Sequence, residues 1–364
     1  MLFSTISAAA ALVSIHVATA TVVPRATTSI DNIQLPAKTV ASLSEINTFL
    51  ENLAPRQNGD LVVSMLQKNA TLHYIKDPTS GHAELTPIYT FPNASGTLGI
   101  GEVSKDTFLI AMHNFKSFLV PFPHTGAVWE LKLNGAGPKD FRVRKVADLP
   151  DVNMLNGMAV IPPKCSGRRP QRLASVLIAD CLQGQLIRLD PSTGAYKVVL
   201  DVPELHAPAA SQFPTGVNGL KIHRGYVYWT NTAKLTVNRI AIDSDGYPVR
   251  NATVQVFDIS SWGGALDDFV FDEKDNIWGV NSLTNTIYVL YHGTGPSSLY
   301  TTYQSVAGAL DSLELPGPTA VTWGAGKHDK HILYVTTSGG TVQPVNGQQE
   351  PAKVVAIDTS GLQK

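Results

Sequence analysis

A unit of about 50 residues recurs six times along this chain. Each unit has an apolar strand, a polar turn and a second strand rich in aromatic or β-branched residues, and a third strand usually follows. The units begin at Phe49, Thr97, Met154, Gly216, Ala265 and Gly317. Repeats of this length are typical of propeller blades, so the pattern predicts an all-β, six-bladed β-propeller with its sheets arranged radially around a central channel. A sandwich or two barrels would not explain the repeated strand order.

A ring of blades needs a strand from one end of the chain to complete the blade at the other end. Segment 37–43 (AKTVASL) precedes the first unit, and we expect it to be the outer strand of the sixth blade. Residues 37–364 then form a single domain, and residues 21–36 are expected to be an extended lead-in around its rim. Long loops on the faces are expected at 163–173 and 203–215.

The composition agrees with many short strands and excludes one class of partner. Glycine (29) and proline (23) are plentiful, as expected for strands joined by turns. Lys and Arg (28) nearly balance Asp and Glu (29), and charged residues make up only 16% of the chain. Binding to nucleic acid requires clustered basic charge, so the sequence predicts no nucleic-acid partner.

Residues 1–20 are almost wholly apolar or small and end in Ala18-Thr19-Ala20. This pattern predicts a secretory signal peptide cleaved after Ala20. The rival interpretation is a membrane anchor, but the apolar core is short for a spanning helix and no basic cluster follows it. We therefore expect a secreted or secretory-lumen protein with no membrane span after cleavage. Three acceptor triplets for N-glycosylation agree with this compartment, at Asn69, Asn93 and Asn251.

The chain has two cysteines, Cys165 and Cys181. An oxidising compartment permits a bond between them. The strand predicted at 174–181 holds them apart unless the preceding loop folds back. Both states therefore remain open, and the fold does not depend on a disulfide framework.

The first strand of each blade lines the channel, so its opening residue should point toward the axis. Aligning the repeats places these residues at Glu51, Gly101 or Glu102, Asn156, Asn218, Asp267 and Thr319. Oxygen ligands converging on one axis are what a hard divalent cation such as Ca²⁺ requires. The alternative is that single Asn and Asp residues form turns through their own backbone. A one-residue slip would put Asp268 in the place of Asp267.

Segments GVNGLKIHRGYVYWTNT (216–232) and ALDDFVFDEKDNIWGVN (265–281) resemble the senescence-marker and gluconolactonase-like six-bladed propellers. The resemblance implies a divalent metal on Glu51, Asn218 and Asp267, with Asn156 as an auxiliary or substrate contact. In lactonases of that family the metal polarises the ester carbonyl and the Asp is the general acid/base.

Two motifs depart from that family. Leu266-Asp267-Asp268 replaces its usual Pro-Asp-Gly, and Glu51-Asn52-Leu53 replaces its Glu-Gly-Pro. The departures leave metal binding open and argue against lactone hydrolysis.

Segments FLENLAPRQNGDLVV, LYVTTSGG, PVNG and AKVVAID are similar to a fungal secreted branch of the same superfamily. Members of that branch act as hetero-Diels–Alderases in secondary metabolism. They couple a quinone methide derived from a tropolone-type polyketide with a terpene alkene such as humulene. The resemblance implies two apolar small-molecule substrates, catalytic roles for Asp267, Asn218 and Asn156, and no required cofactor.

Further residues near strand ends are candidate substrate contacts. They are Trp229, Asn231, His113, Trp278 and Asn281, with Tyr228, Trp323 and Phe269 nearby. The alternative is that the aromatic rings pack between blades and that His113 is structural. Three functions remain open: pericyclase, metal-dependent lactonase, and a non-catalytic ligand-binding propeller. The oligomeric state has no signature in the sequence.

Overall fold

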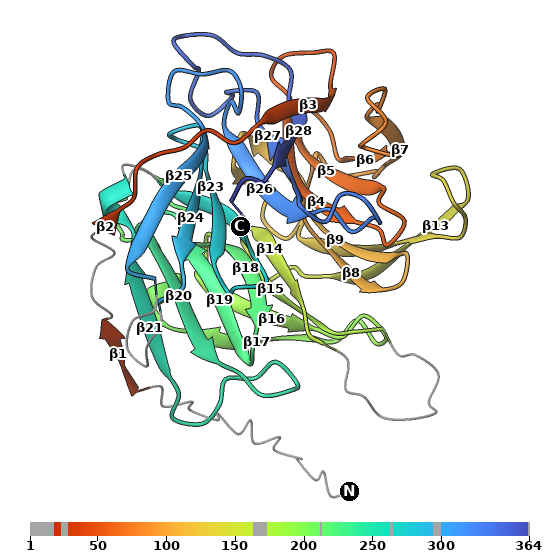
Figure 1. Cartoon of the computed structure of the whole chain (residues 1–364). Coiled ribbons are helices and arrows are strands. Elements are labelled where there is room, and N and C mark those ends of the chain that lie inside the picture. The colour runs from red at the N-terminus through yellow and green to blue at the C-terminus, as the bar shows by residue number, and fades with distance from the viewer. Residues whose placement is uncertain are drawn as a thin grey trace, which may run out of the picture.

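The computed structural model describes residues 18–22, 28–162, 173–211, 213–262, 265–293 and 300–362. In these residues the chain forms six sheets with four antiparallel strands each, together with one small hairpin and two short 3₁₀ turns, Pro203–Leu205 and Ser260–Trp262. Figure 1 shows the sheets following one another around the molecule in chain order. The prediction of an all-β, six-bladed propeller is confirmed.

The first three blades run from inner to outer strand in chain order. Blade 1 contains β4 (Phe49–Pro55), β5 (Leu61–Gln67), β6 (Thr71–Ile75) and β7 (Thr86–Thr90). Blade 2 contains β8 (Gly96–Ser104), β9 (Thr107–His113), β12 (Ala127–Leu133) and β13 (Phe141–Asp148). Blade 3 contains β14 (Leu155–Val160), β15 (Val176–Asp180), β16 (Gln185–Leu189) and β17 (Tyr196–Asp201).

Blades 4 and 5 repeat this order and each gain a fifth, parallel strand from the start of the chain, whereas blade 6 takes its outer strand from there. Blade 4 contains β18 (Val217–His223), β19 (Tyr226–Asn231), β20 (Thr236–Ala241) and β21 (Thr253–Asp258). Blade 5 contains β22 (Leu266–Phe271), β23 (Ile277–Asn281), β24 (Thr286–Tyr291) and β25 (Thr302–Gly308). Blade 6 contains β26 (Pro318–Trp323), β27 (Ile332–Thr337), β28 (Lys353–Asp358) and β3 (Ala37–Ser42).

The N-terminal segment ties three blades together. Strand β3 pairs antiparallel with β28, so segment 37–43 closes the sixth blade as predicted. Before it, β2 (Thr28–Ser29) pairs parallel with β25, and β1 (Ala18–Val22) pairs parallel with β21. The lead-in therefore follows the outer edges of blades 4 and 5, as Figure 1 shows at the left of the view.

The core lies between blades, because each sheet has two faces to cover. Six apolar clusters each join side chains of two neighbouring blades, and together they complete the circle. The sixth cluster packs Tyr334 and Val354 of blade 6 on Leu53 and Val63 of blade 1. Inner strand β26 also contacts β4, so the ring is closed at its centre as well as at its rim.

The structure bears on several of the remaining expectations. Asn69, Asn93 and Asn251 are exposed, as a glycosylation acceptor must be, while their modification stays a prediction. Cys181 is a buried free thiol, and Cys165 lies outside the described residues. The signal-peptide prediction falls mostly on residues 1–17, which are also outside them; β1 extends across the predicted cleavage position. Among the described residues there is no helix long and apolar enough to cross a membrane.

Candidate active site at the centre of the propeller

The inner strand of every blade has an irregularity near its start, where it pairs with the second strand. In five blades two residues are extruded there as a β-bulge. The bulged pairs are Glu51-Asn52, Leu98-Gly99, Asn156-Gly157, Asn218-Gly219 and Asp267-Asp268. In blade 6 a single residue, Thr319, takes this place. A bulge re-aims a side chain, and here it turns the first residue of four pairs into the central cavity.

The prediction for blade 2 is wrong. The register shift in β8 lies between Thr97 and Ile100, so Leu98 occupies the ring position. Gly101 and Glu102, the residues predicted, pair with β9 farther along the strand. The segment carries two glycines two residues apart, and the sequence alone could not choose between the two alignments.

In blades 2, 3 and 4 the second residue of the bulged pair is a glycine that packs against the inner strand of the next blade, and this packing explains the Asn-Gly sequences. A Cβ added at Gly157 would lie 2.2 Å from the carbonyl oxygen of Asn218, and one at Gly219 would lie 2.7 Å from that of Asp267. Real Cβ atoms do not approach an oxygen so closely, so glycine is required at these positions.

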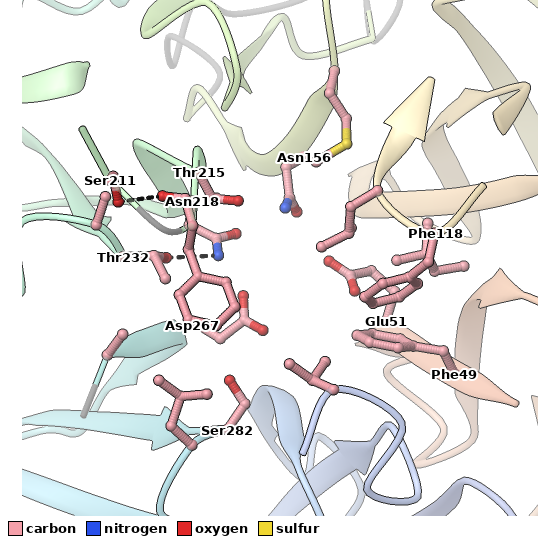
Figure 2. A pocket seen from close by; sticks show the side chains of 18 of the residues that line it. Phe49, Glu51, Phe118, Asn156, Ser211, Thr215, Asn218, Thr232, Asp267 and Ser282 are labelled. Atoms are coloured by element: carbon pink, nitrogen blue, oxygen red, sulfur yellow. Dashed lines mark hydrogen bonds between the residues drawn. The ribbon is translucent and has the colours of Figure 1, made fainter. Parts of the chain in front are cut away.

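The cavity at the axis is lined by polar and apolar side chains (Figure 2), and the four polar side chains at the bulges of the inner strands are called its floor below. It encloses about 930 Å³ of space, including open solvent at its mouth. Glu51, Asn156, Asn218 and Asp267 come together there from four different blades. The apolar lining consists of Phe49, Leu66, Phe118, Leu119, Met154, Phe213, Ala233, Leu235, Ala265, Leu283 and Val342.

Sequence reasoning missed this apolar lining because much of it lies in the connections between repeated strands. Phe118 and Leu119 belong to an insertion in blade 2, the hairpin of β10 (Phe115–Ser117) and β11 (Val120–Pro121). Phe213 lies in the long loop before blade 4. The signal that could have revealed the hairpin is the run FKSFLVPFP, which is unusually apolar for a surface loop.

Two carboxyl groups share the floor, and both favour the protonated form. Burial is the main cause that raises the pKa of Asp267 to about 8, and the charge of Asp268 adds to it. A hydrogen bond from Asn218 opposes this shift. Burial also raises the pKa of Glu51 well above its usual range, with further contributions from Asp267 and Asp268. The side chain of Asp267 is therefore mostly protonated, and so uncharged, at pH 7.

Hydroxyl groups of blade 4 hold this part of the floor in place. The Asn218 side-chain amide donates to Thr232 Oγ1 over 3.0 Å, which leaves the amide oxygen facing the cavity (Figure 2). Thr230 Oγ1 donates to the carbonyl oxygen of Asp267 over 2.7 Å. Asp267 is thus positioned by its own bulge and by the neighbouring blade.

A second polar layer lies next to this floor. Asp268 is buried, and Lys221 Nζ donates to its two carboxylate oxygens over 2.6 and 2.8 Å. Asn52 Nδ2 lies 3.5 Å from the same carboxylate. Asp268 is therefore an ion-pair partner, and Asp267 is the member of the pair that lines the cavity.

Two tryptophans predicted as substrate contacts do not line the cavity, so that prediction is corrected. Trp229 is fully buried between blades 3 and 4, and its indole N–H donates to the carbonyl oxygen of Glu204. Trp278 donates to Asp272 and packs edge-on against Trp323 at a centroid distance of 5.3 Å. Their role is inter-blade packing.

The polar substrate contacts predicted at the ends of second strands are also corrected. The oxygen of Asn281 accepts from the backbone N–H groups of Leu283 and Thr284, and that of Asn231 accepts from Lys234. Buried His113 accepts at Nε2 from a backbone N–H, and burial lowers its pKa to about 4. Asn231 and Asn281 shape the turns that follow their strands, His113 joins β9 to the backbone of blade 3, and none of the three lines the cavity.

The oxygen atoms at the floor are of the kind that bind a hard divalent cation. Two carboxyl groups and two amides line it, and the described residues hold no cluster of three or more His, Cys, Asp or Glu side chains that could bind a metal. The exposed oxygen of Asn218 and the two carboxyl groups are oxygen ligands of the kind Ca²⁺ takes, and a cation bound there would favour the ionised carboxylates over the neutral acids. Glu51, Asn218 and Asp267 remain the residues that would hold it.

No family model matches this chain. Two curated proteins are similar to it across most of their length. A protein of a Phoma species, described as "Putative hetero-Diels-Alderase", is 28% identical over 79% of this chain and 83% of the relative. A protein of Sarocladium schorii, described as "Putative hetero-Diels-Alderase asR5", is 27% identical over 90% of this chain and 84% of the relative.

Solved structures share the fold at low sequence identity. A luciferin-regenerating enzyme superposes with a TM-score of 0.58 at 14% identity and covers 90% of this chain and 96% of that one. Regucalcin, a calcium-binding protein of Agrobacterium tumefaciens, superposes with a TM-score of 0.58 at 15% identity, covering 91% and 97%. A structure described as a "putative gluconolactonase" superposes with a TM-score of 0.55 at 13% sequence identity. The superposition covers 91% of this chain and 94% of that one. The resemblance to gluconolactonase-like propellers and to the fungal hetero-Diels–Alderases is thus confirmed.

Proposed function

We propose that this chain catalyses an intermolecular hetero-Diels–Alder coupling in its central cavity. The names of the two curated relatives support this reaction class. The observation that carries the proposal is a largely apolar cavity with a neutral carboxylic acid at its floor. We propose as substrates a quinone methide derived from a tropolone-type polyketide and a terpene alkene such as humulene.

The reaction needs no oxidant and releases no atoms. The C=O and C=C bonds of the heterodiene and the C=C bond of the alkene are consumed. One C–O bond and one C–C bond form, and a new C=C bond appears at the centre of the former heterodiene. Because no proton has to leave the product ring, the protein contributes by holding the two partners face to face and by polarising the heterodiene oxygen.

Asp267 is the group suited to that polarisation. As a neutral acid it donates a hydrogen bond to the heterodiene oxygen, which withdraws electron density from the diene as the C–O bond forms. Asn218 orients Asp267, and Asn156 can offer a further amide contact from blade 3. If a divalent cation binds Glu51, Asn218 and Asp267, it would supply Lewis-acid polarisation of the same oxygen.

The coupling rate tests the proposal. A quinone methide released in situ is mixed with the alkene, with and without purified protein, and product formation is compared with the spontaneous rate. We expect acceleration by the native chain and its loss in Ala233→Trp, which fills the cavity from a turn. A rate equal to the spontaneous background would contradict the proposal.

A metal-dependent lactonase is the second candidate, favoured by the carboxyl and amide ligands at the floor. Lactone hydrolysis that a chelator abolishes would favour this candidate over the pericyclase. A non-catalytic binding propeller would instead show thermal stabilisation by ligands without turnover of either substrate class.

We also propose that residues 1–20 are removed and that the mature chain enters the secretory pathway with glycans on Asn69, Asn93 and Asn251. The exposure of the three Asn side chains supports this. N-terminal sequencing of the protein secreted by a fungal host should read from Thr21; an intact Met1 would contradict it.

A further inference from the structure

The walls of the central cavity differ in chemistry from one side to the other (Figure 2). Phe49 and Phe118 lie on one side, with their ring centroids 5.7 Å apart. Hydroxyl-bearing side chains lie on the opposite side, around Asn218 and Asp267. They are Ser211, Thr215, Thr232 and Ser282.

The apolar wall is built by blades 1 to 3 together with the β10–β11 hairpin. Leu66, Leu119 and Met154 complete it beside the two phenylalanines. Glu51 lies beside Phe49 and Phe118 on this side of the cavity, and apart from its carboxyl group the wall offers hydrocarbon and aromatic surface. Such a surface binds a hydrocarbon by excluding water and gives it no polar anchor.

The hydroxyl wall comes from blades 4 and 5 and from the loop before blade 4, and it carries hydroxyl groups among apolar side chains of the same segments, which are Phe213, Ala233, Leu235, Ala265 and Leu283. Within the described residues, the side-chain hydroxyls of Thr215 and Ser282 have no protein hydrogen-bond partner, and both residues line the cavity. They remain available to a ligand. A molecule carrying oxygen atoms gains hydrogen bonds on this side of the cavity, next to Asp267. Against the apolar wall its oxygen atoms would have no hydrogen-bond partner.

We propose that the two walls are separate subsites, an inference that rests on the proposed function. The alkene lies against Phe49 and Phe118, and the oxygen-bearing heterodiene lies against the Thr215 and Ser282 hydroxyls with its reacting oxygen toward Asp267. This arrangement presents one face of each partner to the other. It determines which alkene face reacts and the orientation of addition.

Phe118 is the specificity-determining residue for the hydrocarbon partner. Its side chain is 37% exposed on a hairpin that is an addition to the blade, so its truncation leaves the propeller core intact. Phe122 is a matched control: it follows the same hairpin, is 42% exposed and does not line the cavity. Ser282→Ala is the complementary change on the hydroxyl wall.

Steady-state kinetics with each substrate varied in turn test the two subsites. Phe118→Ala should raise the KM for the alkene about tenfold, as expected from the loss of an aromatic contact surface, and leave the KM for the heterodiene unchanged. Ser282→Ala should raise only the KM for the heterodiene, by a few-fold. Phe122→Ala should change neither. Equal increases in the two KM values in Phe118→Ala would overturn the inference while the pericyclase proposal stands.

A binding measurement tests the same subsites without turnover. The hydrogenated alkene should raise the melting temperature of the native chain and of Ser282→Ala equally, and that of Phe118→Ala by clearly less. The phenol corresponding to the reduced quinone methide should show the reverse pattern. Equal stabilisation of all three chains by both compounds would overturn the two subsites. Absence of any rate acceleration by the native chain would instead contradict the proposed function.

Discussion

At the residue scale, two neighbouring positions of each inner strand have different tasks. In four blades the first residue of the bulge faces the cavity, and in blades 2, 3 and 4 the second residue is a glycine that packs against the inner strand of the next blade. Asn156-Gly157 and Asn218-Gly219 meet both requirements with an amide and a glycine. Reading one unit alone would explain Asn218 as a turn former; reading it against five other units predicted its place at the axis.

A methyl group at the second position should therefore be costly. Gly157→Ala places a Cβ 2.2 Å from the carbonyl oxygen of Asn218, so we expect the free energy of unfolding to fall by about 1–3 kcal/mol. Gly137→Ala is the control, because nothing lies within 4 Å of the added Cβ. Thermal or urea unfolding measures both, and equal stability of the two variants would show that the blades do not pack this closely.

The pKa of Asp267 predicts a pH profile. Because it is raised to about 8, the neutral acid is present below that pH, and the coupling rate should fall about tenfold per unit above it. Asp267→Asn keeps a hydrogen-bond donor that does not titrate, so its slower rate should be flat after subtraction of the spontaneous rate. A native profile without an inflection between pH 7 and 9 would contradict the neutral-acid role.

The same pKa has a consequence for stability. Between about pH 4 and pH 8 the folded chain keeps a proton that the unfolded Asp267 has lost. This group therefore makes the folded state less stable as the pH rises through that window.

At the scale of single elements, the residues that could not be predicted lie in connections. The repeat pattern predicted the inner and second strands of every blade and the third strand of most blades, because their periodicity is strong. It could not predict that the β10–β11 hairpin carries Phe118 over the cavity, since that insertion occurs in one blade. The sequence left two roles open for the aromatic residues within strands, substrate contact and packing between blades, and the structure buries Trp229 between blades 3 and 4.

The turns after the second strands depend on a polar cap. Asn281→Ala removes an acceptor of two backbone N–H groups, so unfolding free energy should fall by about 1–3 kcal/mol and substrate KM should rise as Ser282 and Leu283 move. Asn281→Asp keeps the acceptor, as blade 3 does with Asp180, which accepts from Gln183 N–H. Circular dichroism melts and kinetics compare the variants. If Asn281→Asp lowers the stability and raises the KM as much as Asn281→Ala does, the loss of the hydrogen-bond acceptor does not explain the effect.

At the scale of the whole molecule, the fold could be predicted because six similar units admit few closed arrangements. The closure itself was also predictable, since 37–43 is a strand without a blade of its own. The extra parallel strands β1 and β2 were not, because two to five residues pairing with a distant edge leave no periodic signal.

Ring closure should dominate stability. A chain beginning at Ala37 keeps β3 on β28, whereas a chain beginning at Ser44 loses it and exposes an open edge. We expect the first to melt a few degrees below the native chain and the second to melt far lower or to aggregate. Calorimetry and light scattering compare them; similar melting of the two chains would mean that β3 does not close the propeller.

The most direct measurement of the central claim is the stereochemistry of the coupled product. Spontaneous coupling in water has no chiral influence on two achiral partners and gives a racemate. Chiral chromatography should find one enantiomer in large excess with the native chain and a racemate with Ala233→Trp, whose indole fills the cavity. A racemic product from the native chain, or an enantiomeric excess that survives Ala233→Trp, would show that the central cavity is not where the coupling occurs.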